Sequence, residues 1–202
     1  MVETYLRQSP LSHLHLDMQK ERDSKAPDAS VKITEVPHRL MIALRGSPTD
    51  KAFIPAIENA LSVDLPLAPC TSSGDPEGVH VLWMGPDEWL VVAPEDKYDG
   101  LAIRLASALT GVHASVVDVS ESRTTIRLSG TKARETLSKG SSIDLHPRAF
   151  AKGRVVNSLL AQAHVTLHQI ADEEDPAYDI FVHRSFAEYL WSWLEDATRE
   201  YD

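Results

Sequence analysis

Residues Val79–Leu109 read VHVLWMGPDEWLVVAPEDKYDGLAIRLASAL, and this stretch decides the fold. Two apolar runs rich in Val, Leu and Trp flank Gly85-Pro86-Asp87-Glu88, whose proline and aspartate suit the two corners of a type I turn. The pattern predicts a β-hairpin. Apolar residues then recur at helical spacing, so we expect a helix over Asp96–Leu109 that ends before Gly111.

The same order of elements returns at Val165–Ala197. Alternating strands flank an acidic turn at Asp172–Pro176, and a helix follows whose apolar residues we expect on one stripe: Phe186, Tyr189, Leu190, Trp193, Leu194 and Ala197. Upstream, Ile42-Ala43-Leu44-Arg45-Gly46 lies 84 positions (126 minus 42) before Ile126-Arg127-Leu128-Ser129-Gly130. A fixed offset across several elements indicates an internal duplication, with chance similarity between β-rich stretches as the alternative.

The rest of the chain supplies further strands and helices in the same alternation. We expect strands at Val31–Ile33, Leu40–Leu44, Val116–Ser120, Arg123–Leu128 and Arg154–Leu160, and helices at Thr49–Leu61 and Thr131–Leu137. This order predicts an α+β fold, internally duplicated, with largely antiparallel sheets and helices. We interpret residues 31–202 as a single duplicated domain with half-repeats at about 31–111 and 115–200.

Residues 1–30 are polar and charged, and we expect a flexible N-terminal arm. One apolar island interrupts it, formed by Leu11, Leu14, Leu16 and Met18, and the run Lys20–Ala29 after it reads as a solvated link. The island suits a segment that contacts another surface. An ordinary frayed terminus is the alternative.

Composition excludes several classes of partner. The 20 basic and 30 acidic residues give a net charge of −10, which argues against nucleic acid or an anionic membrane as the main partner. No apolar run approaches the length of a membrane span, and the first 30 residues lack the apolar core of a signal peptide. The single cysteine suits a reducing compartment, so we expect a cytoplasmic protein.

Histidines are numerous, but their spacing does not favour a metal site. His13 and His15 lie two apart, and His164 and His168 lie four apart, with no cysteine or carboxylate at ligand spacing. A zinc site needs three or four converging ligands. The apolar residues between His164 and His168 suit the core, so we expect both imidazoles to face solvent.

No other residue pattern points to a catalytic site. Asp118 lies in an apolar strand and is expected to be partly buried, where it suits a structural role at the turn Ser120-Glu121-Ser122 better than catalysis. Cys70 has no sequence-near base or positive field that would activate a thiol. Phosphate-binding glycine loops and nucleophile elbows are absent.

Instead, the irregular connector Ser141–Gly153 indicates a contact surface. It combines apolar side chains with His and Arg outside any periodic element, which is typical of interface anchors. The residues predicted at a partner interface are Leu11, Leu145, His146, Pro147, Arg148 and Phe150. The alternative for Leu145 and Phe150 is that they cover one end of the core.

Several blocks of sequence, in order, resemble the γ subunit of heterotetrameric sarcosine oxidase. The resemblance spans roughly residues 31–200, with Ser9-Pro10-Leu11 similar to the start of such subunits. The blocks are Trp83-Met84-Gly85-Pro86-Asp87-Glu88-Trp89-Leu90, Asp118-Val119-Ser120-Glu121-Ser122-Arg123, Leu128-Ser129-Gly130-Thr131-Lys132-Ala133, Leu137-Ser138-Lys139-Gly140, Asp144-Leu145-His146-Pro147-Arg148-Ala149-Phe150 and Arg184-Ser185-Phe186-Ala187-Glu188-Tyr189-Leu190-Trp191.

The resemblance implies a fold similar to the folate-binding domain of aminomethyltransferases. It implies a complex that oxidatively demethylates sarcosine to glycine, with hydrogen peroxide and 5,10-methylenetetrahydrofolate as products. It also implies that FAD, FMN, NAD, tetrahydrofolate and zinc are bound by the α, β and δ subunits, and that this chain binds none of them.

Two departures from related families bear on function. Aminomethyltransferases carry a catalytic aspartate after a segment like Arg154–Leu160, whereas this chain reads Leu160-Ala161-Gln162-Ala163-His164-Val165. Related iron–sulfur maintenance proteins carry a cysteine after Lys-Gly, whereas Ser141-Ser142 follows Lys139-Gly140 here. We therefore expect a non-catalytic structural subunit. The alternatives are a stand-alone folate-binding protein, with a pocket lined by Asp118 and Trp83, or an assembly factor.

Overall fold

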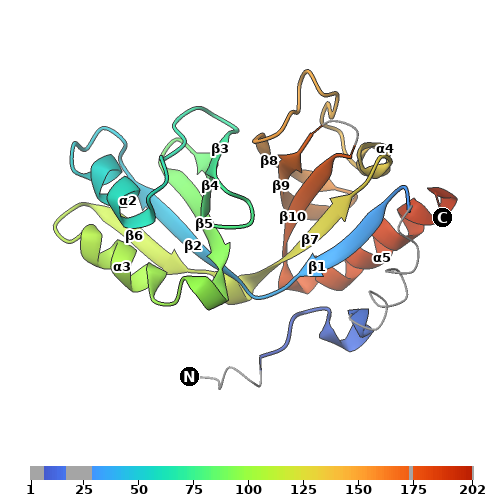
Figure 1. Ribbon diagram of the computed structural model, residues 1–202, viewed down its shortest axis with the longest axis horizontal. Helices are drawn as coiled ribbons and strands as arrows, with labels where there is room; N and C mark the ends of the chain where they lie inside the picture. The colour runs from blue at the N-terminus through green and yellow to red at the C-terminus, as the bar shows by residue number, and fades with distance from the viewer. Residues whose placement is uncertain (1–6, 17–28, 173–174, 202) are drawn as a thin grey trace. The chain divides into compact units, whose positions relative to one another are not determined.

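The computed structural model describes residues 7–16, 29–172 and 175–201. The chain forms two compact units (Figure 1). Unit 1 contains the chain up to Pro37, Glu121–Ala151 and the chain from Ser158 onward, and unit 2 contains His38–Ser120 and Lys152–Asn157. The flexible arm over 1–30 and the single duplicated domain over 31–202 remain predictions.

Unit 2 has a five-stranded antiparallel sheet in the order β3-β4-β5-β2-β6. The predicted hairpin is confirmed, since Trp83 lies opposite Trp89 and Gly85 opposite Glu88. The strands are β2 (Arg39–Gly46), β3 (Ser72–Gly74), β4 (His80–Gly85), β5 (Glu88–Pro94) and β6 (Ala114–Asp118).

Helices α2 (Phe53–Leu61) and α3 (Leu101–Ala108) cover one face of this sheet (Figure 1). The Phe53 ring packs against Trp89 with centroids 5.6 Å apart, and a Cβ at Gly46 would lie 2.1 Å from the Phe53 ring, so only glycine fits there.

The predicted start of the helix over Asp96–Leu109 is wrong. A short 3₁₀ turn, η3 (Glu95–Lys97), comes first, and α3 begins at Leu101. Gly100 separates them with φ at +72°, in the left-handed region, which a continuous right-handed helix cannot contain.

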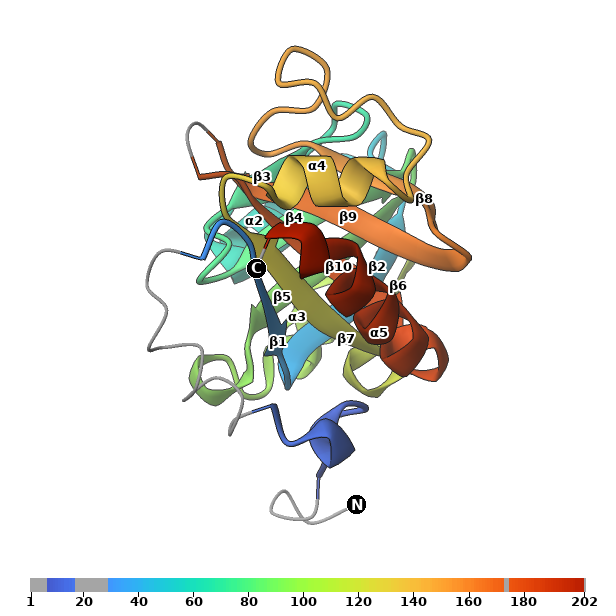
Figure 2. The same cartoon turned by 90° about the vertical axis from the view of Figure 1, so that its right-hand side faces the viewer.

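Unit 1 has a second five-stranded antiparallel sheet, in the order β1-β7-β10-β9-β8. Helices α4 (Ala133–Ser138) and α5 (Ala187–Thr198) lie on one side of it, in front of the strands in Figure 2. The strands are β1 (Lys32–Val36), β7 (Arg123–Ser129), β8 (Val155–Leu160), β9 (Ala163–Ala171) and β10 (Ala177–His183). The first three residues of β8 are counted with unit 2. The α+β class with antiparallel pairing is confirmed.

Each half of the chain runs strand, strand, helix, three strands, helix, which is the succession expected of a duplication. The leading strand of each half joins the other half's sheet. Strand β1 pairs with β7, placing Ile33 opposite Leu128, and β6 pairs with β2, placing Val116 opposite Leu44. Each sheet therefore needs residues from both halves of the sequence.

The described N-terminal residues pack onto unit 1. Leu11 is fully buried, Ser9 donates a 2.7 Å hydrogen bond to Glu35 on β1, and Arg7 forms an ion pair with Glu121. The apolar island thus contacts the chain's own unit 1. Met18 and most of the predicted link Lys20–Ala29 lie outside the described residues.

The residues predicted on one stripe of α5 differ in burial. Phe186 is 44% exposed and Tyr189 39% exposed, while Trp191, which the stripe omits, is buried. The buried face of α5 consists of Ala187, Leu190, Trp191, Leu194, Ala197 and Thr198. Helical spacing alone could not separate two adjoining apolar faces.

A buried ion pair joins two central strands of the unit 1 sheet. Arg127 on β7 lies opposite Asp179 on β10. The Arg127 Nε donates to Asp179 Oδ1 at 2.7 Å and its Nη2 donates to Oδ2 at 3.0 Å, in a bidentate geometry. Asp179 is 1% exposed, so Arg127 compensates for the water that its carboxylate loses on burial.

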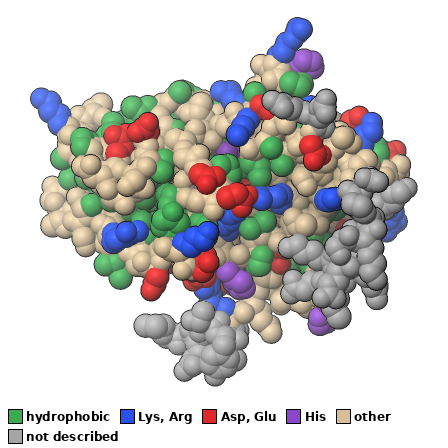
Figure 3. Space-filling view, viewed as in Figure 1, with side chains coloured by type: hydrophobic (Ala, Val, Ile, Leu, Met, Phe, Trp, Pro, Cys, Tyr) green, Lys and Arg blue, Asp and Glu red, His purple; other side chains and the backbone are tan. Residues whose placement is uncertain are grey.

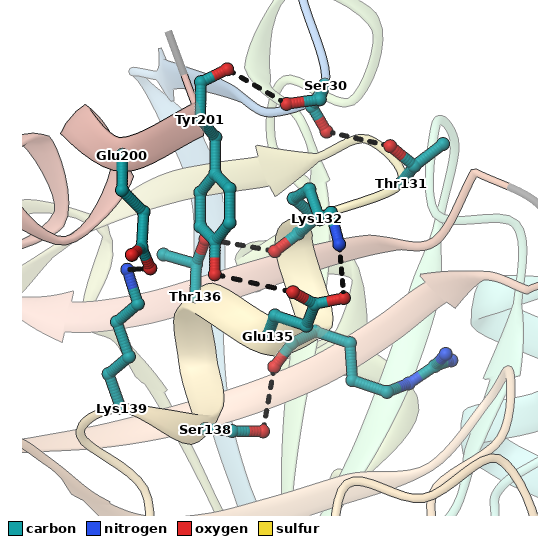
Figure 4. Close-up of polar contacts among 10 residues, drawn as sticks. Ser30, Thr131, Lys132, Glu135, Thr136, Ser138, Lys139, Glu200 and Tyr201 are labelled. Carbon is teal, nitrogen blue, oxygen red and sulfur yellow. Dashed lines mark hydrogen bonds and ion pairs between the residues drawn. The ribbon is translucent and has the colours of Figure 1, made fainter.

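The C-terminal residues are tied to α4 by charged contacts (Figure 4). Lys139 pairs with Glu200, and its Nζ lies 4.5 Å from the centre of the Tyr201 ring. The Tyr201 backbone carbonyl accepts a hydrogen bond from the Ser30 hydroxyl at 3.1 Å. The hydrogen bond from Lys139 lowers the pKa of Glu200, and Glu200 in turn raises the pKa of Lys139.

We predict that Asp179→Ala lowers the free energy of unfolding by about 1.5–3 kcal/mol, because it removes two charge-assisted hydrogen bonds from the Arg127 guanidinium, which is partly reached by solvent. Urea denaturation would measure the change. Arg45→Ala, which removes exposed pairs with Asp87 and Glu88, is the control and should cost less than about 1 kcal/mol. Equal losses in the two variants would contradict the role of the buried pair.

We predict that Glu200→Gln lowers the melting temperature at pH 7 and that the difference from wild type disappears at acid pH. Because the pKa of Glu200 is below its usual 4.5, its pairing stabilises the fold above pH 4.5 and is lost as the pH falls through the folded-state pKa. Thermal melts from pH 7 to pH 3 would show this. The exposed Glu195→Gln on α5 should show no such trend, and a constant difference for Glu200→Gln down to pH 3 would refute the coupling.

Candidate partner interface

The connector loop, Ser141–Gly153, is anchored to unit 1 by two buried side chains. Leu145 and Phe150 are both buried, and the Phe150 ring stacks on Tyr178 with centroids 6.5 Å apart and planes inclined by 23°. Burial raises the pKa of the Tyr178 hydroxyl, an effect that the nearby Arg134 guanidinium partly offsets. A neutral phenol thus stays under the loop.

Backbone hydrogen bonds hold the tip of this loop in a defined turn. The His146 carbonyl accepts from the Ala149 and Phe150 amides at 2.8 and 2.9 Å. Asp144 Oδ1 accepts from the His146 amide at 2.9 Å, and His146 Nδ1 accepts from the Arg148 amide at 3.2 Å. Four consecutive residues are thereby exposed on an ordered turn: His146, Pro147, Arg148 and Ala149.

The structure brings five of the six predicted interface residues together in this loop. The sixth, Leu11, lies in the described N-terminal segment, just before the 3₁₀ turn at Ser12–Leu14. Leu11, Leu145 and Phe150 are buried in this chain itself, and the exposed side chains are His146, Pro147 and Arg148. A partner at this surface stays a prediction for all six residues.

The two segments in which related families carry functional residues are neighbours here. The Ala161 amide donates to the Gly140 carbonyl at 2.9 Å, and Ser141 pairs with Leu160. The β8–β9 turn consists of Ala161 and Gln162, so it offers no carboxylate to orient a folate amine. In this part of unit 1 the two segments are joined by backbone hydrogen bonds.

The two residues expected to line a folate pocket, Trp83 and Asp118, lie on strands that are not neighbours. Trp83 is on β4 and packs against the unit 2 core, whereas Asp118 is on β6. Strands β5 and β2 lie between them, which separates their backbones by about 14 Å at the usual strand spacing. These two side chains cannot line one small site.

Asp118 has the structural role predicted for it. Its Oδ1 accepts hydrogen bonds from the Ser120 amide at 2.9 Å and the Ser120 hydroxyl at 2.6 Å. The expectation of partial burial is wrong, since Asp118 is exposed at the end of its strand. Cys70 is half-buried with a positive φ of 60°, and its carbonyl accepts from the Val155 amide at 3.0 Å.

The two histidines of β9 differ in their exposure to solvent. His164 is exposed, as predicted, but His168 is 1% exposed, so the expectation that it faces solvent is wrong. Both faces of β9 are covered along most of its length, which strand alternation alone does not reveal. Within the described ranges, no three His, Cys, Asp or Glu residues converge in a way that could hold a metal ion.

Charge is mixed on the visible surface. Figure 3 shows acidic and basic side chains interspersed, with no single basic patch on that face. No helix in the described part of the chain is both long and apolar enough to cross a lipid bilayer.

Sequence reasoning missed the buried Arg127–Asp179 pair and the exposed aromatic face of α5. Alternation gives no signal for the first, because Arg127 and Asp179 occupy the polar positions of their strands, where exposed side chains are expected. Alternation did not show that the two would be direct cross-strand neighbours. The exposed aromatic face could be identified only from the way α5 packs on unit 1.

Comparison with known proteins gives consistent matches. The model of the sarcosine oxidase gamma subunit family matches residues 45–200. A sarcosine oxidase subunit gamma from Arthrobacter sp. is 35% identical over 198 residues, covering 98% of this chain and 93% of the relative, and one from Corynebacterium sp. (strain U-96) is 34% identical with the same coverage.

Solved structures agree with these matches. A chain of the heterotetrameric sarcosine oxidase from Corynebacterium sp. U-96, in complex with pyrrole 2-carboxylate, superposes with a TM-score of 0.86 at 33% identity, over 97% of this chain and 96% of that one. The glycine cleavage system aminomethyltransferase T from Bartonella henselae shares the fold, with a TM-score of 0.66 at 15% identity over 86% of this chain and 47% of that one. This confirms the predicted likeness to aminomethyltransferases at the level of fold.

The family model matches most of the chain, and a gamma subunit is 35% identical to it over 98% of its length. The chain therefore belongs to the sarcosine oxidase gamma subunit family.

Proposed function

We propose that this chain is the non-catalytic γ subunit of a heterotetrameric sarcosine oxidase, which it supports structurally. The observation that carries the proposal is its near full-length likeness to one chain of such a complex. The complex would oxidise sarcosine to glycine and form hydrogen peroxide and 5,10-methylenetetrahydrofolate. Its other subunits, α, β and δ, would be the partners of this chain in the cytoplasm.

FAD, FMN, NAD, tetrahydrofolate and zinc would be bound by those partners. The residues of this chain do not fit a folate site of the aminomethyltransferase kind, because the turn at Ala161-Gln162 lacks a carboxylate and Trp83 lies far from Asp118. The described residues likewise offer no set of three converging ligands for zinc.

This chain would contribute to the complex by offering a surface to which another subunit binds. In the connector loop, buried Leu145 and Phe150 fix the turn, and the turn presents His146, Pro147 and Arg148. An ordered turn loses little conformational entropy when it binds, which favours its use as a contact. We assign this exposed turn to an interface with another subunit.

The first experiment is co-expression of α, β and δ with and without this chain. We expect that omission reduces the yield of the full-size complex and its flavin content, and that sarcosine-dependent peroxide formation falls in proportion. Size-exclusion chromatography with light scattering, flavin absorbance and a peroxide assay give the readouts. A complete complex with normal turnover in the absence of this chain would contradict a structural role.

A second prediction concerns the loop turn. Arg148→Asp should weaken incorporation into the complex by about tenfold, because a reversed charge at an interface is repelled and desolvated. The melting temperature of the isolated chain should stay near wild type, since Arg148 is exposed.

The matched control is Arg104→Asp, an equally exposed arginine on α3 in unit 2. It should be incorporated like wild type. If both variants enter the complex normally, the connector loop is not the interface, although the subunit assignment would stand.

A further inference from the structure

Helix α5 is apolar over more of its surface than the core of unit 1 uses. Its buried face is already complete with Leu190, Trp191 and Leu194. Tyr189 and Trp193 lie four residues apart on one neighbouring flank of α5, and Phe186, the last residue of the 3₁₀ turn η5 (Arg184–Phe186), precedes them at the start of the helix. We call these three residues the aromatic stripe. Phe186 and Tyr189 are exposed, and Trp193 is half-buried.

Two residues of the aromatic stripe are held in place by the β8–β9 turn and the segment beside it. The Tyr189 hydroxyl accepts a hydrogen bond from the Gln162 amide at 3.3 Å. The Trp193 ring lies on Gly140, where an added Cβ would be 2.5 Å from Trp193 Cζ2. Their orientation therefore exists before any partner binds, which lowers the entropic cost of binding.

The exposed face of α5 next to the aromatic stripe is acidic, whereas the stripe is uncharged. The stripe itself contains no charged side chain, whereas the adjoining exposed face of α5 carries Glu188, Glu195 and Asp196. Asp196 pairs with Arg199 at 3.1 Å, and Glu188 lies 3.6 Å from the His13 imidazole. A complementary surface would be apolar at its centre and basic on the side that faces these carboxylates.

We propose that the aromatic stripe of α5 is a second contact surface, and that its occupant is an apolar patch with a Lys or Arg rim on a partner subunit of the oxidase. This inference rests on the proposed function. Tyr189 and Trp193 have a polar tip and are held by neighbouring segments of the free chain, and the exposed Phe186 adds apolar surface beside them. Exposed aromatic side chains of this kind have the composition of interface anchors. The stripe is separate in sequence from the exposed turn of the connector loop.

The test is a competition for incorporation. Wild-type chain and a variant, with different affinity tags, are co-expressed with α, β and δ, and the ratio of the two tags in the purified full-size complex is measured. Phe186→Asp and Tyr189→Asp should each be incorporated at less than one tenth of the wild-type level. Phe186→Ser, a milder change, should give an intermediate ratio.

The matched control is Ile103→Asp on α3, which replaces an apolar side chain that is 72% exposed on a helix of unit 2. It should be incorporated like wild type. Far-ultraviolet circular dichroism and the melting temperature of each isolated variant establish that it is folded, and Phe186→Ser carries the test if an aspartate variant is not.

Normal incorporation of folded Phe186→Asp and Tyr189→Asp would overturn the inference while leaving the subunit assignment intact. A wild-type chain that enters no complex at all would overturn both. An isolated wild-type chain that is dimeric in light scattering, with a monomeric Phe186→Asp variant, would show that the occupant is a second copy and would also overturn the inference.

Discussion

The exchange of leading strands is the constraint on which the rest of this structure depends. Strand β1 completes the sheet that contains β7, and β6 completes the sheet that contains β2. Without these strands, β7 and β2 would be sheet edges with unpaired backbone groups. The pairing therefore links the folding of the two halves of the sequence, and it explains why unit 1 is assembled from stretches far apart along the chain.

Within unit 1, buried groups position the surfaces to which we assign function. Phe150 stacks on Tyr178 and holds the connector loop, while Gly140 and Gln162 hold the aromatic stripe. The same neighbourhood contains the turn in which related folate enzymes carry a carboxylate. Here the Ala161 amide donates a backbone hydrogen bond to the Gly140 carbonyl.

Local patterns were predicted well wherever neighbouring residues decide the structure. The Gly85–Glu88 hairpin and the Asp118–Ser120 turn formed as expected, because turn propensity and side-chain to backbone hydrogen bonds act over a few residues. The errors fall where longer range packing decides. The aromatic flank of α5 and the burial of His168 depend on what covers each face, and helix α3 starts late because Gly100 takes a left-handed conformation.

The sequence by itself determined the α+β class, the repeated order of elements and, through its resemblance, the family, because periodicity and adjacent motifs are properties of the chain in one dimension. It also identified the connector loop as a segment that no periodic element explains. Only the tertiary structure decided that β1 and β6 exchange sheets, that Arg127 meets Asp179, and which aromatic residues of α5 stay exposed. The physical reason is that strand pairing and side-chain burial join residues distant in sequence, and their partners are chosen by the packing of the whole unit.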